Sequence, residues 1–327
     1  MTVSPSTFSG PSPEDRHRVA VVRCAGYEPG LVRQRLAEGF TLLGGLEALV
    51  GAAKSVLVKP NLFAAMRPER AQTTHPALVR ATCDAIGRIG ASAAVGDNPV
   101  FGFTALTYRV TGMRDALRGS GSPLVSLRKT TARDAPDGRR VTRFLLPERL
   151  ADFDRLVSLP KLKAHALMGL TGAVKNSYGL VHGGGERKLL HLRHADPDAF
   201  AEMLLDLDAV VRPALYVVDG VVAADGNGPR HGRPRPVGVL VLGTNGTAVD
   251  FVLARIVGLP VETVVTLRVA LRRPEWRDPE RRIEVVGTPL SALDPVEFQP
   301  ATPGGVIRAL PGPLRDALIR RSRKPRP

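Results

Sequence analysis

The chain has only two cysteines in 327 residues, Cys24 and Cys83, and both stand in apolar stretches. So few cysteines do not make a disulfide framework, and they are typical of a protein from a reducing compartment. No run of about 18 apolar residues occurs, so we expect no membrane span. The first residues lack a basic segment followed by an apolar run, which argues against a signal peptide. The sequence therefore predicts a cytoplasmic protein.

Aromatic residues are also scarce, at 5%, although the net charge is +15. Proteins that bind nucleic acid combine basic surfaces with aromatic stacking residues or with recognisable modules. Here most of the positive charge comes from arginines spread along the whole chain, and no such module is visible. We therefore expect no nucleic-acid partner.

What the sequence does contain is a hydrophobic fraction of 43% and apolar strand-like runs that alternate with helical patterns. This alternation predicts an α/β fold with a mixed, mostly parallel sheet flanked by helices. We expect a disordered tail over 1–15, a single α/β domain over 16–290 and a basic carboxy-terminal extension over 291–327. The expected strands are 18–24, 55–59, 92–97, 123–127, 140–145, 156–159, 215–219, 237–242 and 282–286. The expected helices are 31–50, interrupted at Gly44-Gly45, and 76–89, 103–117, 197–211, 245–257 and 262–271.

Several of these strands run directly into polar residues. In open α/β sheets ligands bind outside the carboxyl ends of the strands, so these side chains should lie in one site. Lysine ammonium groups there suit a phosphate or carboxylate, although each could also extend into solvent. The carboxylates could hold a divalent metal or could serve only in turns. The residues are Lys59, Asn61, Lys161 and Lys163 for substrate binding, and Asp97 and Asp219 for metal binding.

A second group of candidates follows the strand at 156–159. His165 and His182 flank the pair Lys175-Asn176, and imidazole is the usual group for proton transfer near neutral pH. We assign catalytic roles to His165, Lys175 and His182, and substrate binding to Asn176. Lys175 could act as a base of lowered pKa or as a Schiff-base nucleophile.

The motifs together resemble the bacterial and archaeal proteins called domain of unknown function family 362, over roughly residues 55 to 260. The matching segments are 58–62, 74–76, 91–97, 156–165, 171–179, 218–220, 226–229 and 248–250. Many members of that family carry a carboxy-terminal ferredoxin-like cysteine cluster, which this chain lacks. The resemblance therefore implies the core domain and its candidate site, but no iron–sulfur cluster of its own.

These observations lead to one main hypothesis and two alternatives. The first is an enzyme that acts by proton transfer on a small anionic metabolite, in the manner of a lyase or isomerase, with a possible divalent metal. The second is a redox accessory protein that works with an iron–sulfur partner. The third is a module that binds an anionic ligand without turnover.

Overall fold

The computed structural model describes residues 16–99, 103–181, 183–227 and 232–301. The expected tail over 1–15 and most of the expected extension lie outside the described residues. Among those described, residues 291–301 include Phe298 and Ala301, which are buried in the hydrophobic core. No helix in the described ranges has the length and apolar character needed to cross a bilayer.

A nine-stranded mixed sheet forms the centre of the molecule, in the order β11-β1-β10-β9-β6-β2-β3, with β7 and β8 attached beside β9. Five strand pairs are parallel and three are antiparallel, which confirms the predicted α/β class. The strands are β1 His17–Arg23, β2 Ser55–Pro60, β3 Ser92–Val95, β6 Arg155–Leu159, β7 Lys161–His165, β8 Gly169–Thr171, β9 Leu215–Asp225, β10 Arg233–Gly243 and β11 Ile283–Gly287. A separate hairpin pairs β4 Thr130–Asp134 with β5 Arg143–Pro147.

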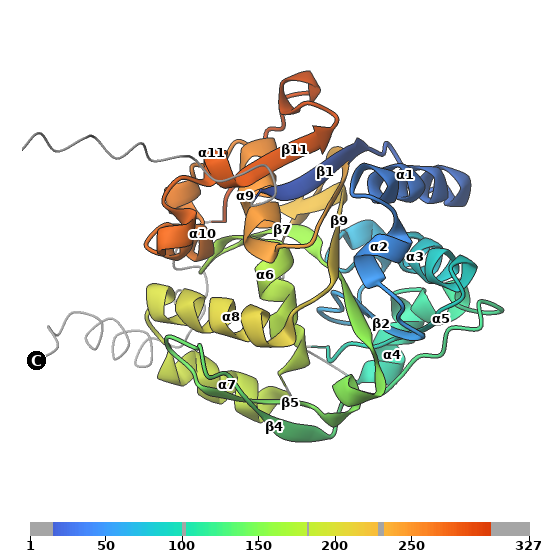
Figure 1. The fold of residues 1–327 in the computed structure, drawn as a ribbon, viewed down its shortest axis with the longest axis horizontal. Coiled ribbons are helices and arrows are strands. Elements are labelled where there is room, and N and C mark those ends of the chain that lie inside the picture. Colours follow the sequence, from blue (N-terminus) through green and yellow to red (C-terminus); the bar gives the residue numbers. More distant parts are fainter. Residues whose placement is uncertain (1–15, 100–102, 182, 228–231, 302–327) are drawn as a thin grey trace, which may run out of the picture.

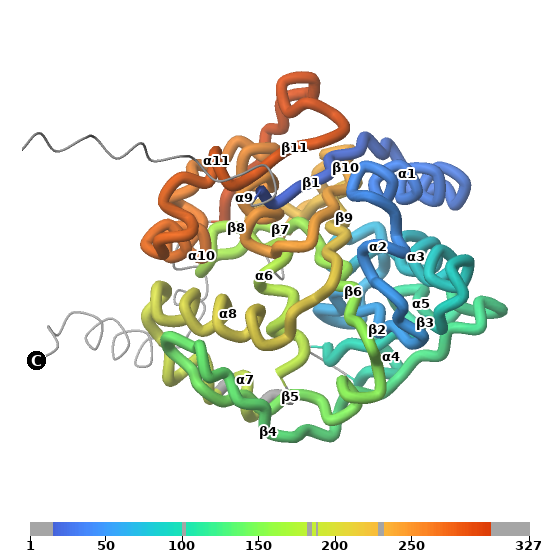
Figure 2. Tube along the Cα trace, in the orientation of Figure 1, coloured from blue at the N-terminus to red at the C-terminus, as the bar shows by residue number. Residues whose placement is uncertain are grey.

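Helices cover both faces of this sheet, as Figures 1 and 2 show. One face carries α1 Pro29–Leu42, α2 Leu46–Val50, α3 Pro76–Arg88, α4 Thr104–Val110 and α5 Met113–Ala116. The other carries α6 Ala173–Asn176, α7 Gly183–Arg193, α8 Pro197–Val211, α9 Gly246–Ile256, α10 Val265–Ala270 and α11 Pro279–Arg282. Strands with both faces covered need apolar residues at successive positions, which explains the continuous apolar runs in the sequence.

Successive strand residues point to opposite faces and thereby supply two separate hydrophobic clusters. In β2, Val56 and Val58 pack with the α1–α3 side, while Leu57 packs with the α8–α9 side. Lys59 continues the alternation of Leu57, so its side chain enters the side occupied by α6 and α8. The alternation thus decides which helices can contact the candidate lysine.

Local sequence signals explain where several helices begin. The Asp196 carboxylate accepts a hydrogen bond from the Ala199 amide at the start of α8, and the Asn245 side chain accepts one from the Ala248 amide at the start of α9. Both are favoured N-cap residues. The predicted helices at 197–211 and 245–257 agree with α8 and α9 to within a residue at each end.

Among the differences between the structure and the expected elements, the following have a clear physical cause. The segment 123–127 is not a strand, and only an isolated bridge joins Leu124 to Val95. The expected helix at 103–117 is two short helices, since Gly112 adopts a left-handed conformation between them. Strand β7 was not predicted, because its lysines and histidine are polar residues that are not typical of a buried strand. Between them, Leu162 and Ala164 are fully buried.

Candidate functional site

The candidate site lies at the carboxyl edge of the sheet. Strands β9, β6, β2 and β3 are neighbours and run parallel, so their carboxyl ends meet at the same edge. Strand β7 follows β6 after Pro160 and pairs in parallel with β9 beyond Asp219. The polar residues that follow these strands are therefore brought together there.

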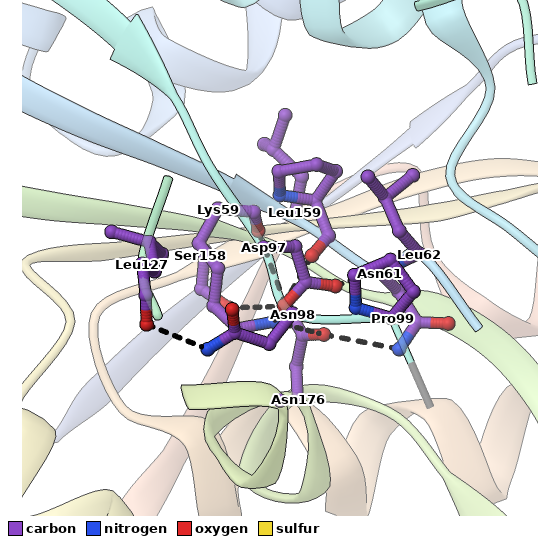
Figure 3. Close-up of polar contacts among 12 residues, drawn as sticks. Lys59, Asn61, Leu62, Asp97, Asn98, Pro99, Leu127, Ser158, Leu159 and Asn176 are labelled. Carbon is purple, nitrogen blue, oxygen red and sulfur yellow. Dashed lines mark hydrogen bonds and ion pairs between the residues drawn. The ribbon is translucent and has the colours of Figure 1, made fainter. Parts of the chain in front are cut away.

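Lys59 lies at the centre of this edge and is completely buried. Its ammonium group forms an ion pair with Asp97 Oδ1 at 2.8 Å and donates to Asn176 Oδ1 at 3.1 Å (Figure 3). The other oxygen of Asp97 accepts from the Leu62 amide at 2.7 Å. Burial lowers the pKa of Lys59, and Asp97 opposes that shift. The buried charge is thus compensated, which is the condition for keeping it inside a protein.

Two asparagines extend the network from Lys59 to Lys163. Asn61 donates to Asn176 Oδ1 at 3.2 Å and accepts from Lys163 Nζ at 2.6 Å. Asn176 also donates to the Ser158 hydroxyl at 2.9 Å. Lys163 makes a second bond to the Gln72 backbone carbonyl at 3.0 Å, so its partners are neutral oxygens.

Lys161 belongs to a neighbouring buried ion pair. Its ammonium group lies 2.9 Å from Asp219 Oδ2 and 2.9 Å from the Tyr27 hydroxyl. The Tyr27 hydroxyl donates to Asp219 Oδ1 at 2.6 Å, and the His75 amide donates to Asp219 Oδ2 at 2.8 Å. The Tyr27 and His75 rings stack at 3.7 Å. This pair joins the middle of β9 to the loop after β1 and to the start of α3.

A buried carboxylate holds the backbone of the segment that carries Lys175. Asp250 on α9 accepts from the Ala173 amide at 2.6 Å and the Val174 amide at 3.2 Å, at the start of α6. A Cβ atom on Gly172 would lie 2.3 Å from Asp250 Oδ1, so only glycine leaves room for this contact. Burial raises the pKa of Asp250 to about 7, against the effect of the two amides.

The end of α6 is held by a second carboxylate, which is partly buried. Asp208 on α8 accepts from the Ser177 hydroxyl at 2.6 Å and from the Tyr216 hydroxyl at 2.7 Å. Burial raises the pKa of Asp208 to about 7. Two residues further on, a Cβ on Gly179 would lie 2.6 Å from both Asp97 Oδ1 and Lys59 Nζ, so this glycine makes room for the central ion pair.

Lys175 differs from the other lysines of the site because no hydrogen bond or ion pair engages its ammonium group within the described residues. Its nearest recorded contact is the Tyr178 ring, with the centroid 5.8 Å from Nζ. Burial, and then the positive charges of Arg187 and Lys59, lower the pKa of Lys175 to about 8. An amine with this pKa is in part deprotonated near neutral pH and can accept a proton.

Arg187 on α7 is a cation of this site that the sequence reasoning missed. The guanidinium is buried and donates to the backbone carbonyls of Asn98, Pro99 and Gly179, at 2.7, 3.2 and 2.6 Å. It therefore joins the turn after β3 to the segment after α6. Its neighbours in the sequence are mostly polar and basic, so they do not indicate that Arg187 is buried. Its burial depends on contacts with Asn98 and Pro99, about 90 positions away in the chain.

His165 ends β7 and is held in one tautomer. Its Nδ1 atom accepts from the amides of Leu167 and Met168, both at 3.2 Å. Burial and the nearby charges of Lys175 and Lys163 lower its pKa well below the ordinary value, so the ring is neutral with the proton on Nε2. The ring can donate a hydrogen bond from Nε2 but has no free basic nitrogen. His182, the other histidine assigned to catalysis, lies outside the described residues.

The structure gives Asp97 and Asp219 a role other than the expected one of metal ligands. Each carboxylate is engaged by a lysine ammonium group and by backbone amides, and a nearby ammonium repels a divalent cation. In the described ranges no group of three or more His, Cys, Asp and Glu side chains could hold a metal. Both carboxylates are thus ion-pair partners of lysines here, and their role as metal ligands stays a prediction.

The spacing of His191 and His194 is also explained without a metal. The His191 ring stacks on Phe200 at 4.3 Å, and His194 Nδ1 lies 3.0 Å from the Leu190 carbonyl. Both histidines therefore take part in the packing of α7.

Comparison with known proteins agrees with the resemblance seen in the sequence. A family model described as "Domain of unknown function (DUF362)" matches residues 56–255. The thylakoid-associated protein sll1697 of Synechocystis sp. is 34% identical over 251 residues, which cover 76% of this chain and 77% of the relative. Among solved structures, the lactate racemase apoprotein from Thermoanaerobacterium thermosaccharolyticum aligns with a TM-score of 0.48 at 14% identity.

That alignment covers 74% of this chain and 58% of the racemase chain, so the chain spans little more than half the length of the racemase. No residue role is transferred across it. The family model covers well over half of the chain, and the thylakoid-associated relative is similar over three quarters of it. The chain belongs to the family described as Domain of unknown function (DUF362).

Proposed function

We propose that the protein is an enzyme that moves a proton on a small anionic metabolite, in the manner of an isomerase or lyase. The observation that carries this proposal is Lys175, an amine of lowered pKa inside a cluster of buried cations. Lys59, Lys163 and Arg187 add positive charge near it, and the charge of Lys59 is balanced by Asp97. Such a cluster suits a carboxylate or phosphate.

In this proposal Lys175 is the general base. Its neutral amine would take a proton from a carbon next to the carboxylate of the ligand, and the ammonium so formed would return the proton to the same or another position. The negative charge that develops on the carboxylate oxygens would lie among Lys163 and the positive charges around it. Fixed charges at such a position stabilise the transition state without reorganisation.

His165 supports this chemistry as a hydrogen-bond donor. Because its Nδ1 is occupied by two backbone amides, only Nε2–H can reach a ligand oxygen. A neutral imidazole that donates to an oxygen can stabilise an enolate without carrying charge itself. The proton transfer first assigned to His165 therefore passes to Lys175 in this proposal.

Lys59 and Lys161 have a supporting role here. Each is neutralised by its own carboxylate and held by further hydrogen bonds. They fix the positions of Asn176 and of strand β7, and so the positions of Lys175 and Lys163.

The experiment is a solvent-exchange assay on small carboxylates in D₂O, in which NMR follows the loss of carbon-bound protons. The wild-type protein should exchange the proton next to the carboxylate of at least one compound. Lys175→Ala and Lys175→Arg should both lose this activity, because a guanidinium does not deprotonate near neutral pH. Lys175→Arg should still bind the ligand, since its positive charge remains.

Lys129→Ala is the matched control, because that lysine is exposed and its ammonium group pairs with Glu148 instead of with a residue of the cluster. Undiminished exchange in Lys175→Ala would remove Lys175 from the role of base. Tight binding by the wild type without any exchange would instead favour a ligand-binding module without turnover.

A further inference from the structure

The polar side chains at the centre of the site are closed off from solvent. Lys59 is completely buried, and Asn176 and Lys163 are 2% and 5% exposed. A ligand cannot reach these groups unless some element of the structure moves. Strand β2 is hydrogen-bonded to a neighbour on each side, and α6 is held by Asp250 and Asp208. The moving part must therefore be an element with a weaker attachment.

Helix α7 has such a weak attachment. It lies at the periphery beside α8 (Figure 1), and unlike α6, α8 and α9 it is in extensive backbone contact with no other helix or strand of the described part of the chain. Among its described side chains, only Arg187 and Leu190 are buried. Leu190 belongs to the hydrophobic core and His191 stacks on Phe200 of α8, so the carboxy-terminal half of α7 is anchored. In the amino-terminal half, the side-chain hydrogen bonds to other described elements all involve Arg187.

Three glycines begin this amino-terminal half. Residues 183–185 are all glycine, which is among the poorest helix formers. A Cβ built at Gly185 would meet nothing within 4 Å, in contrast to Gly179, so lack of space does not require glycine there. The consequence of glycine at this position is backbone freedom, which suits a hinge.

Arg187 connects α7 to the protein that covers the central ion pair. Its guanidinium donates to the carbonyls of Asn98 and Gly179, at 2.7 and 2.6 Å. A Cβ on Gly179 would lie 2.6 Å from both Lys59 Nζ and Asp97 Oδ1, so this glycine lies directly against the pair. Gly179 thus stands between Lys59 and Arg187, and its lack of a side chain leaves little protein between them.

Tyr178 makes a similar connection between α7 and Lys175. Its hydroxyl donates to the Arg187 carbonyl at 2.9 Å, and its ring meets the His191 ring edge-on at 5.6 Å. The Lys175 ammonium group lies 5.8 Å from the centre of the same ring. Movement of α7 would therefore uncover the side of the site that holds Lys59 and Lys175.

We propose that the amino-terminal half of α7 is a hinged lid over the site and that Arg187 is the latch that keeps it closed. Residues 183–185 form the hinge, and the other half of the helix stays packed on α8. Opening breaks the three bonds from Arg187 to backbone carbonyls, which water then hydrates, and admits a ligand to Lys59 and Lys175. The inference goes beyond the proposed function, because an enzyme and a binding module need the same access.

The test is acetylation of the native protein by acetic anhydride, with the rate at each lysine read by peptide mass spectrometry. Lys59 and Lys161 are a matched internal pair, because both are buried and each is paired with an aspartate. Lys59 lies behind Gly179 and Arg187, whereas Lys161 bonds to Tyr27 on the loop after β1. In the wild type Lys59 should react faster than Lys161 at low denaturant concentration, because local opening takes less free energy than global unfolding.

Arg187→Ala should raise the rate at Lys59 about tenfold or more, the change expected when a charge-assisted hydrogen bond is lost, and should leave the rate at Lys161 unchanged. The loss of the positive charge alone would raise the pKa of Lys59 and slow its acetylation, so a faster reaction reports opening. Arg80→Ala should change neither rate, since that guanidinium also donates to two backbone carbonyls but lies on α3.

Arg187→Lys is a second variant, which also serves if Arg187→Ala does not fold. It keeps the charge but not the planar set of donors that reaches several carbonyls, so it should give an intermediate rate at Lys59. An equal rise at Lys59 and Lys161 would mean that the whole domain is loosened, and it would overturn the lid. Unchanged acetylation of Lys59 in the Arg187 variants that fold would overturn it too. So would equal rates for both lysines in the wild type at every denaturant concentration, because Lys59 would then be reached only by global unfolding.

Discussion

At the scale of single residues, Lys175 has the property on which the proposed chemistry depends. Its pKa is lowered from 10.5 to about 8 by burial and by the charges of Arg187 and Lys59. The pKa of Lys175 is lower in the folded protein than in the unfolded chain. The charged amine therefore lowers the stability of the native state by its full amount below about pH 8. This destabilisation is relieved as the pH rises from about 8 towards 10.5.

A direct titration checks this value. In protein labelled with ¹³C at lysine Cε, the Lys175 signal, assigned by its absence in Lys175→Arg, should titrate with a midpoint near 8. The reference for comparison is the ordinary lysine value of about 10.4. A midpoint for Lys175 above about 10 would mean that its ammonium group is solvated or paired.

Gly179 offers a second prediction at this scale. A methyl group there would lie 2.6 Å from Lys59 Nζ and from Asp97 Oδ1, so Gly179→Ala should separate the buried ion pair. Breaking a buried pair typically costs about 3–5 kcal/mol, and we expect a loss of that order in chemical denaturation. Gly87→Ala is the control, because nothing lies within 4 Å of its added Cβ in the last turn of α3. That change should leave the stability unchanged or raise it slightly, since alanine has the higher helix propensity.

At the scale of elements, α6 depends on contacts from two longer helices. Asp250 accepts hydrogen bonds from two backbone amides at the start of α6. Asp208 accepts one hydrogen bond from the Ser177 hydroxyl at the end of α6 and one from the Tyr216 hydroxyl on β9. Both carboxylates have a pKa raised to about 7, yet their partners differ. Backbone amides can only donate, whereas hydroxyl groups can also accept.

This difference predicts unequal effects of the same substitution. Asp250→Asn leaves at least one amide without an acceptor and should cost about 1–3 kcal/mol of stability. Asp208→Asn should cost less, because the Ser177 or Tyr216 hydroxyl can rotate to accept from the new amide group. Denaturant unfolding of both variants at neutral pH measures the difference. An equal or larger loss in Asp208→Asn would show that the hydroxyl groups cannot reorient.

At the scale of the whole molecule, the net charge of +15 attracts anions from a distance, whereas the buried ammonium groups act only on contact. Salt separates the two effects, because the screening length falls from about 10 Å at 0.1 M to about 3 Å at 1 M. Raising the salt concentration over this range should weaken the binding of the dianion malonate more than that of the monoanion acetate, because long-range attraction grows with the charge of the ligand. A preference for malonate that comes from contacts inside the site should persist at 1 M salt. Calorimetric titrations at several salt concentrations would show this, and a preference that disappears with salt would assign it to the surface charge.

The sequence by itself determined the α/β class, most strands and helices, and the sheet edge at which the site lies. These features follow from local periodicity and from the polar residues at strand ends, such as Lys59 and Asp97. Both signals can be recognised from neighbouring positions in the sequence. Strand β7 was not predicted, because lysines usually lie on the surface and two of its five residues are lysines. A reading of the alternating Leu162 and Ala164 could have found it.

Only the tertiary structure decided what each polar residue does. It paired Asp97 and Asp219 with lysines rather than with a metal, brought Arg187 into the site, and held His165 in a tautomer that leaves no free base. It also left Lys163 and Lys175 without a carboxylate among the described residues. The two ion pairs join residues that are 38 and 58 positions apart, and Arg187 reaches Asn98 across 89 positions. The burial of these groups also depends on the whole fold. No local pattern in the sequence carries that information, because the strength of a charge interaction is set by the surrounding protein.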